Sequence, residues 1–390
     1  MPIQTGELLR ATAANQTLSG GSGADTMIWS PLTGPALYHG GDTGEAYDPN
    51  PYFDRSGGDR LVIESAVGVR LRMLTTEDGI ARGAGQVLTF TGIERLHLGD
   101  GNDTLNAATA TPAAAHDGTP VHGLTVYAGG GNDLVVGSGA DDFMDGGSGN
   151  DTIRAGGGWD FIQSSTGDDL IHGGGGNDNI RWGQGNPDEI IGNDTIYGGE
   201  ADEAGGDLMN IWVRDWDGTG VKVDFLTNES GVAETDIGGA HSTLHFFAFE
   251  NFFTHEGNDT VSAAAARIRA DHAGVHFNTR WGDDRLTGSR GNDGLEGGEG
   301  RDTIEGGQGD DMISAADAIY DPHSRPDGVA DVLIFHAGFG HDTIRAFDPG
   351  LDELRFDPGM THDQRDTAAG ILLTFSGGDS ILLENVHVFG

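Results

Sequence analysis

Aspartate residues recur at a fixed spacing in the middle of this chain, and their side chains could bind divalent cations. From Asp133 onward an aspartate occurs every nine residues, and an apolar residue follows two positions after each one. Carboxylate oxygens are the ligands that hard divalent cations prefer. A phase held over six units indicates a repeat architecture. The aspartates are Asp133, Asp142, Asp151, Asp160, Asp169 and Asp178, and the apolar residues are Val135, Met144, Ile153, Ile162, Ile171 and Ile180.

Glycines precede most of these aspartates and define the element that must position them. The stretch from Gly146 to Ile153 reads Gly-Gly-Ser-Gly-Asn-Asp-Thr-Ile. Such a glycine density indicates a tight turn, because glycine adopts positive φ at no steric cost. The apolar residue then lies in a short extended segment with its side chain pointing inward. A turn and a short strand make half a coil, so two units close one coil of 18 residues.

On such a coil, alternate aspartates stack on opposite edges. Adjacent parallel strands lie roughly 4.7–4.9 Å apart, and Ca²⁺ binds oxygen at about 2.3–2.6 Å. An ion between two coils could therefore take carboxylates from both, with turn carbonyl groups supplying further oxygens. Mg²⁺ prefers about 2.0–2.1 Å and a strict octahedron, so it fits this spacing less well. Calcium is the metal that the geometry favours.

The turn sequence Gly-Gly-x-Gly-x-Asp-x-U-x, in which U is apolar, resembles the nonapeptide of the RTX, or hemolysin-type calcium-binding, family. The likeness is specific because the units are tandem and in phase. It implies a parallel β-roll, calcium in the turns and secretion by a type I system without a cleaved N-terminal signal. Five stretches match the first eight positions, namely residues 20–27, 146–153, 173–180, 297–304 and 306–313.

A second run of the repeat lies nearer the C-terminus, with Asp284, Asp293, Asp302 and Asp311 nine residues apart. We expect ions between aspartates 18 residues apart, which are the pairs 133/151, 151/169, 142/160, 160/178, 284/302 and 293/311. The resemblance implies further carbonyl ligands from the second and fourth glycines of the clearest motifs. These are Gly147, Gly149, Gly174, Gly176, Gly298, Gly300, Gly307 and Gly309.

Two turns depart from the motif, and some aspartates stand alone. Ala140 replaces the fourth glycine before Asp142, and a Ser-Ser-Thr sequence at 164–166 replaces the first three positions before Asp169. Both departures weaken the expected sites. Four aspartates at the motif position in isolated units either bind calcium or cap their turns by Asx hydrogen bonds. These are Asp25, Asp103, Asp194 and Asp259.

The composition fits a solenoid with a thin core better than a compact globule. Of 390 residues, 68 are glycine, and 36% are hydrophobic. The net charge of −41 argues against nucleic acid and anionic membranes as partners. Cysteine is absent, which excludes disulfides and thiolate metal sites. No basic and apolar leader opens the chain, and no apolar stretch is long enough to insert into a membrane.

The predicted fold is all-β: a β-roll or β-helix solenoid with a C-terminal antiparallel β cap. Two tandem modules each begin with an irregular β segment, since residues 68–74 resemble 220–226 and alternate apolar with polar. The predicted divisions are a cap with one repeat at 1–58, modules at 59–197 and 198–315, and a terminal cap at 316–390. The β-rolls proper span 128–181 and 279–314. By resemblance, the last 50–60 residues, roughly, carry a secretion signal.

Without metal, stacked carboxylates would repel one another. Two charges 4 Å apart repel by about 1 kcal/mol in water and about 4 kcal/mol at a dielectric near 20. Summed over two edges, this repulsion should exceed the stability of a thin core. We therefore predict a chain that is largely unfolded at cytosolic calcium levels and folds outside the cell, where calcium stabilises it by mass action.

No catalytic motif for a zinc protease, serine hydrolase or P-loop enzyme occurs in the chain. The favoured function is a secreted structural, interaction or adhesion-type module, with type I secretion machinery as one partner. Extracellular polysaccharide or a cell surface are candidate targets. The alternative is a polysaccharide-acting enzyme with a groove on residues 59–127 and 207–278. Tryptophans 182, 212, 216 and 281 either fill the core or stack on sugars.

Overall fold

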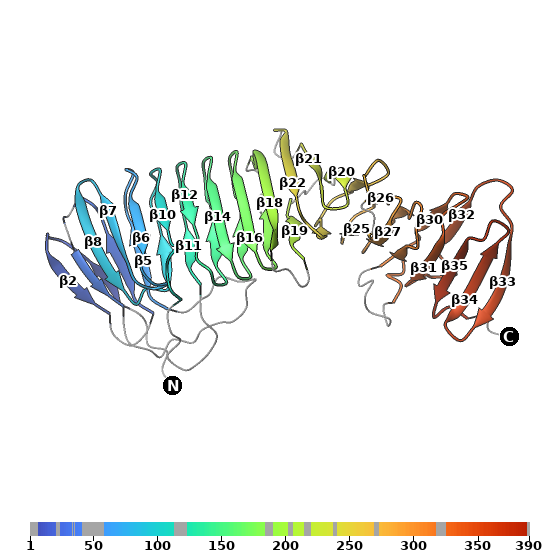
Figure 1. Cartoon of the computed structure of the whole chain (residues 1–390), viewed down its shortest axis with the longest axis horizontal. Coiled ribbons are helices and arrows are strands. Elements are labelled where there is room, and N and C mark those ends of the chain that lie inside the picture. The colour runs from blue at the N-terminus through green and yellow to red at the C-terminus, as the bar shows by residue number, and fades with distance from the viewer. Residues whose placement is uncertain are drawn as a thin grey trace. The chain divides into compact units, whose positions relative to one another are not determined.

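Every regular element that the computed structural model describes is a β-strand (Figure 1). The chain divides into two compact units, which we call unit 1 (residues 1–183 and 191–207) and unit 2 (184–190 and 208–390). The helices that a membrane span would need, long and apolar, are absent from the described residues. The structure describes residues 7–20, 24–32, 34, 36–40, 58–112, 123–183, 190–201, 206–213, 220–236, 240–268, 273–316 and 325–387.

Unit 1 consists of two sheets whose strands follow one another as rungs of a solenoid (Figure 1). The first sheet is parallel throughout, in the order β1 (Leu8–Arg10), β3 (Thr26–Trp29), β5 (Arg60–Ile63), β9 (Arg95–His97), β11 (Thr125–Tyr127), β13 (Phe143–Asp145), β15 (Phe161–Gln163) and β17 (Asn179–Trp182). The second runs β2 (Gln16–Ser19), β4 (Ala36–His39), β8 (Gln86–Thr91), β7 (Gly79–Gly83), β6 (Arg70–Met73), β10 (Thr104–Asn106), β12 (Leu134–Val136), β14 (Thr152–Gly157), β16 (Leu170–Gly175) and β18 (Asn193–Ala201).

Unit 2 has the same two-sheet construction. Its first sheet runs β19 (Leu208–Ile211), β23 (Asn251–Phe253), β25 (Ala273–Asn278), β27 (Asn292–Glu296), β29 (Met312–Ser314), β31 (His341–Arg345), β35 (Ser380–Glu384), β34 (Gly370–Phe375) and β33 (His362–Thr367). Its second runs β22 (Ser242–Phe247), β21 (Ser230–Thr235), β20 (Lys222–Thr227), β24 (Thr260–Ser262), β26 (Arg285–Thr287), β28 (Thr303–Glu305), β30 (Val332–Phe335) and β32 (Glu353–Phe356).

The predicted 18-residue coil is confirmed by the strand register. Leu134 pairs with Thr152, which pairs with Leu170, and on the other sheet Phe143 pairs with Phe161. The predicted inward residues of both runs are at most 1% exposed, so they form the thin core between the sheets. Burial of these single apolar side chains, one for each half coil, is the main hydrophobic gain available to the repeats.

The glycines of the motif are required at particular positions. The first glycine leaves room for the aspartate, since a Cβ on Gly146 would lie 2.8 Å from the Asp151 Oδ2 atom. In turns such as that at Gly149, the fourth glycine has positive φ and packs against the coil before it. A Cβ on Gly149 (φ +120°) would lie 2.1 Å from the carbonyl oxygen of Gly131, so a side chain there would collide with the neighbouring coil. Ala140 is tolerated at this position because its φ is not positive.

The two irregular β segments both form antiparallel hairpins inserted into the second sheet. Strands β6, β7 and β8 do so in unit 1, and β20, β21 and β22 do so in unit 2. The predicted alternation is confirmed, because Leu71 and Met73 are buried whereas Arg70 and Arg72 are exposed. The sequence similarity of the two segments thus reflects the same local topology.

At the C-terminus the antiparallel part is smaller than the four or five strands that we predict from the sequence. Only β33, β34 and β35 are antiparallel. Strands β30, β31 and β32 instead continue the parallel rungs by pairing with β28 and β29. The reason is that Asp331 and Asp342 repeat the turn geometry of the motif, so the coil continues before the chain reverses direction.

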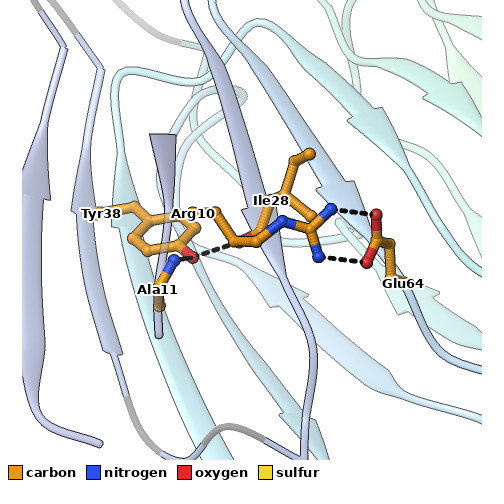
Figure 2. Close-up of polar contacts among 5 residues, drawn as sticks. All are labelled: Arg10, Ala11, Ile28, Tyr38 and Glu64. Carbon is orange, nitrogen blue, oxygen red and sulfur yellow. Dashed lines mark hydrogen bonds and ion pairs between the residues drawn. The ribbon is translucent and has the colours of Figure 1, made fainter. Parts of the chain in front are cut away.

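The N-terminal strands belong to the same two sheets of unit 1. Figure 2 shows how their ends are joined: Arg10 makes two hydrogen bonds of 2.6 Å with Glu64. The hydroxyl of Tyr38 donates to the carbonyl of Ile28 (2.5 Å) and accepts from the Ala11 N–H (3.3 Å). Tyr38 is fully buried, so this contact between β3, β4 and the end of β1 is stronger than the exposed ion pair. The division at residue 58, like those at 197 and 315, remains a prediction.

Replacing the glycine at the fourth motif position should destabilise the protein far more than replacing a glycine at the third. We expect Gly149→Ala to destabilise the calcium-loaded protein by about 2 kcal/mol or more, from backbone strain and the collision with Gly131. Gly139→Ala is the matched control, because a Cβ there would have no heavy atom within 4 Å. Thermal unfolding in calcium measures both variants. Equal midpoints for the two would contradict this account of the stacking.

Candidate metal centre

The motif aspartates of unit 1 form two ladders, one on each edge of the solenoid. On the edge before the second sheet, the N–H of each aspartate donates to Oδ1 of the aspartate in the next coil. The ladder runs in the order Asp103, Asp133, Asp151, Asp169 and Asp194. The N–H to Oδ1 bonds between successive members are 2.6, 2.8, 2.8 and 2.7 Å long.

The opposite edge of unit 1 has the same arrangement. The N–H of Asp142 donates to Asp160 (2.8 Å), that of Asp160 to Asp178 (2.9 Å) and that of Asp178 to Asp207 (2.7 Å). Both ladders arise because the backbone N–H of this position lies where the turn enters a strand and needs a buried acceptor. A carboxylate provides a strong, charge-assisted one.

Unit 2 repeats both ladders. One links Asp259, Asp284, Asp302, Asp331 and Asp352 through bonds of 2.7, 2.9, 2.8 and 3.1 Å. The other links Asp293, Asp311 and Asp342 through bonds of 2.9 and 3.0 Å.

The second carboxylate oxygen is the feature that points to a metal ion. Ladder aspartates are buried, with at most 3% of their surface exposed apart from half-buried Asp352. In many of them Oδ2 has no hydrogen-bond donor within the protein, which a buried carboxyl group tolerates only with a counter-charge or by taking up a proton. These are Asp133, Asp151, Asp160, Asp169, Asp302, Asp311 and Asp342.

Burial is what perturbs these carboxyl groups most. It raises the pKa of Asp133 to about 8, of Asp169 to about 9, of Asp302 to about 8 and of Asp311 to about 9. Repulsion from neighbouring aspartates adds to the effect, and the backbone hydrogen bond opposes it. Desolvation, rather than the repulsion between carboxylates that we predict from the sequence, is therefore the larger cause of the instability of the metal-free state.

The donor atoms fit calcium. They are all oxygens, which Ca²⁺ prefers over the nitrogen and sulfur ligands of transition metals. No three aspartate, glutamate or histidine side chains form a metal cluster among the described residues. An ion would therefore need backbone carbonyls as well as carboxylates from adjacent coils. The carbonyl of Gly147 accepts the Thr166 N–H (3.0 Å), and its second lone pair remains available for a ligand bond. A bound ion would supply the positive charge that the ladders lack.

Two predicted ligands already accept hydrogen bonds from the protein at both carboxylate oxygens. Asp142 accepts the N–H of Ser138 at Oδ2 (2.7 Å) and the Ser138 hydroxyl at Oδ1 (2.9 Å). In unit 2, Asp293 accepts the N–H and hydroxyl of Ser289 in the same way, at 2.5 and 2.8 Å. Serine occupies the second motif position in both turns. These two aspartates thus have their oxygens satisfied without a metal, and they fit an ion less well than the others.

The isolated aspartates are ladder members, and Asp103 also caps its own turn, because its Oδ2 accepts the Gly99 N–H (3.1 Å). Asp25, Asp103, Asp194 and Asp259 are at most 2% exposed, and each is hydrogen-bonded to a neighbouring coil. At Asp194, the buried indole N–H of Trp182 donates to Oδ2 (2.7 Å), which completes that carboxylate with a protein donor.

The departures at 164–166 leave the turn geometry intact. Ser165 adopts the positive φ (73°) that the second glycine has elsewhere, and its hydroxyl donates to Asp145 (2.7 Å). Asp169 therefore keeps its place in the ladder.

Of the four tryptophans considered, Trp182 is fully buried, Trp281 is 39% exposed and Trp212 is half-buried. Trp216 lies outside the described residues.

The structure contains a further, exposed ladder that we did not predict from the sequence. Its members precede the motif aspartates: Asn150 N–H donates to Asn132 Oδ1 (3.0 Å), and Asp168 N–H donates to Asn150 Oδ1 (3.2 Å). In unit 2, Arg301 N–H donates to Asp283 Oδ1 (2.9 Å). The signal was the frequent Asn or Asp at the fifth motif position. Asp331 and Asp342 were missed because the glycines before them are too few to match the motif.

Comparison with known proteins confirms the repeat. A family model for the RTX calcium-binding nonapeptide repeat matches four copies, and the chain therefore carries repeats of this family. No curated protein sequence matches the chain. The residues matched by the family model are 6–28, 89–108, 125–153, 154–187, 191–203 and 279–313.

One solved structure with similarity to this chain is that of the extracellular lipase LipA from Serratia marcescens. The two sequences are 14% identical over 74% of this chain and 43% of that chain, with a TM-score of 0.23. The match thus spans less than half of the lipase.

Acid should favour the metal-free fold. Burial raises the pKa of Asp151 to about 7 and of Asp169 to about 9 in the folded state, against about 3.9 when unfolded, so the folded state holds protons to higher pH. Their contribution to stability is fully present below about pH 4 and is lost as the pH rises through about 7 to 9. In EDTA we expect β-sheet circular dichroism to increase between pH 8 and pH 5.

Salt provides the control for this measurement. Salt at about 1 M screens exposed charges but affects buried ones much less, so it should not reproduce the effect of acid at pH 8. A metal-free spectrum that does not change between pH 5 and pH 9 would contradict the titration of buried carboxyls.

Replacing one ladder aspartate by asparagine should stabilise the metal-free fold and weaken metal binding. Asp151→Asn keeps the Oδ1 acceptor for the Asp133 N–H but removes a charge whose pKa burial raises to about 7. In EDTA at pH 8 we expect the variant to be more stable than the parent, by about 1–4 kcal/mol. In calcium, native mass spectrometry should count one or two fewer bound ions.

Asp283→Asn is the matched control, because Asp283 is exposed and the amide keeps the acceptor for Arg301. It should change neither the metal-free stability nor the ion count. An ion count unchanged in Asp151→Asn would remove Asp151 from the set of ligands.

Proposed function

We propose that this chain is a secreted calcium-binding protein whose RTX repeats fold on binding Ca²⁺ outside the cell. The observation that carries the proposal is the row of buried carboxylates with one oxygen bonded to the next coil and the other without a donor. Such a structure is unstable while the carboxylates are charged and bare. Calcium binding only to the folded state would supply the missing stability.

We assign the ions to the pairs 133/151, 151/169, 160/178, 284/302, and, with less support from hydrogen bonding, 142/160 and 293/311. The glycine carbonyls at positions 147, 149, 174, 176, 298, 300, 307 and 309 complete the ligand sets. Extracellular calcium modules bind at about 10⁻⁴–10⁻³ M, so the sites would be empty in the cytosol and filled outside.

This calcium dependence suits export by a type I system. An unfolded chain passes a secretion channel more readily than a folded solenoid, and the repeats would fold after export. We place the secretion signal within the last 50–60 residues, roughly, because of the family resemblance. Once folded, the solenoid would act as a structural, interaction or adhesion-type module that contacts extracellular polysaccharide or a cell surface.

A second candidate function is action on a polysaccharide. A pocket on the first sheet of unit 2, over β19, β23, β25 and β27, is lined by both an imidazole, of His276, and a carboxylate, of Glu296. This pair on one sheet face is the feature that favours an enzyme, since general acid–base chemistry uses such groups. Depolymerisation or a change of sugar stereochemistry on incubation with polysaccharides would distinguish this function from simple binding.

Calcium titration of the whole chain tests the main proposal. We expect little β-sheet signal in EDTA at pH 7.5 and a cooperative gain with a midpoint of about 10⁻⁴–10⁻³ M Ca²⁺. Mg²⁺ at equal concentration should produce much less structure, because the oxygen cages are not built for its short bonds. Identical circular dichroism in EDTA and in millimolar calcium would refute coupled folding.

A further inference from the structure

A pocket opens on the outward face of the first sheet of unit 2. It lies over β19, β23, β25 and β27 and has a volume of about 190 Å³. On the regular strands of unit 1 this face carries two side chains for each rung, such as Phe143 and Asp145 on β13, and the rings of Phe143 and Phe161 stack on one another. Here it is lined by Leu208 and Phe253 together with four polar side chains, those of Asn251, His276, Asn278 and Glu296.

The polar groups of this pocket are held in fixed positions. The amide nitrogen of Asn278 donates to Glu296 Oε2 (2.9 Å), and its oxygen accepts the Arg280 N–H (2.9 Å). The ring nitrogen Nδ1 of His276 lies 3.2 Å from Asn251 Oδ1. Glu296 and Asn278 are 6% and 8% exposed. A buried carboxylate bonded to an amide on an outward sheet face is not required by the repeat, so it points to a binding role.

The backbone around the pocket is adapted to these side chains. Gly294 occupies a motif position that is a side-chain-bearing residue in most units, and His276 lies directly over it. A Cβ on Gly294 would be 2.1 Å from Cδ2 and 2.4 Å from Nε2 of His276. Arg280 has the positive φ (63°) that the second motif position has in other turns, and its guanidinium lies 4.7 Å over the Phe253 ring.

Aromatic side chains follow immediately after the same strands. Trp212 follows β19, His255 follows β23 and Trp281 follows β25. The rings form a cluster, with centroids 3.7 Å apart for Trp212 and His255 and 5.2 Å apart for His255 and Trp281. Trp281 remains 39% exposed, so one aromatic face of the cluster can contact a ligand.

We propose that this pocket binds one residue of a neutral extracellular polysaccharide, with Asn278 and Glu296 bonding to its hydroxyl groups. The proposal rests on the interaction role inferred above and names a site for it. Sugar hydroxyls both donate and accept, which matches an amide beside a carboxylate. The apolar face of the ring matches Phe253, and Trp281 lies farther along to stack on the next sugar.

The charges around the pocket favour a neutral ligand over a uronate. Glu296 places a carboxylate in the wall, and the protein as a whole carries a charge of −41. Burial lowers the pKa of His276, so the imidazole is neutral at physiological pH and offers no counter-charge. The guanidinium of Arg280 is stacked on Phe253. An acidic sugar would therefore be repelled.

Tryptophan fluorescence and calorimetry on the full chain in saturating calcium test this site. The ligands are oligosaccharides of glucose, mannose or galactose, compared with oligouronates of the same length. We expect at least one neutral series to bind and to change the fluorescence. Glu296→Ala should weaken binding at least tenfold, and Glu296→Gln, which keeps an acceptor, should weaken it less.

Glu299→Ala is the control, because Glu299 is exposed and does not line the pocket. Trp281→Ala, at an exposed position, should reduce both affinity and the fluorescence change even if Glu296→Ala does not fold. Absence of neutral-sugar binding, or equal binding of uronates, would overturn the proposal. In either case an intact calcium-dependent fold would leave the calcium role standing.

Discussion

The whole structure depends on a buried carboxylate whose two oxygens have different surroundings. Oδ1 accepts a backbone N–H from the preceding coil, which sets the rung spacing and register. In many rungs Oδ2 receives no donor from the protein, and burial raises the pKa of the group. The same side chain that aligns the coils thus makes their metal-free stacking unfavourable, and a cation between the coils would resolve this conflict.

Some ladder aspartates are exceptions, because their second carboxylate oxygen accepts a hydrogen bond from the protein. Ser138 and Ser289 complete Asp142 and Asp293, at equivalent turns of the two units, and Trp182 completes Asp194. Burial raises the pKa of Asp293 only to about 6, compared with about 9 for Asp311 in the next coil. The turns thus divide into those whose carboxylate is completed by a protein donor and those whose Oδ2 has no donor from the protein.

Much of this could be predicted from the sequence, because a nine-residue phase fixes both the coil length and the inward residues. Ile153 and Ile304 are fully buried as expected, and Asp133 stacks on Asp151. The continuation through Asp331 and Asp342 could not be predicted, since few glycines precede them and only the register reveals them. The pocket could not be predicted from the sequence either, because His276, Gly294 and Glu296 come together only through the pairing of β25 with β27.

Hydrogen–deuterium exchange of the calcium-bound and metal-free chain tests the central claim most directly. It reports on the backbone N–H groups that the ladder carboxylates accept. At pH 7.5 we expect peptides covering 128–181 and 279–314 to be strongly protected in millimolar calcium and to exchange rapidly in EDTA. Equal protection of these peptides with and without calcium would contradict the claim that the buried carboxylates make the coils depend on a cation.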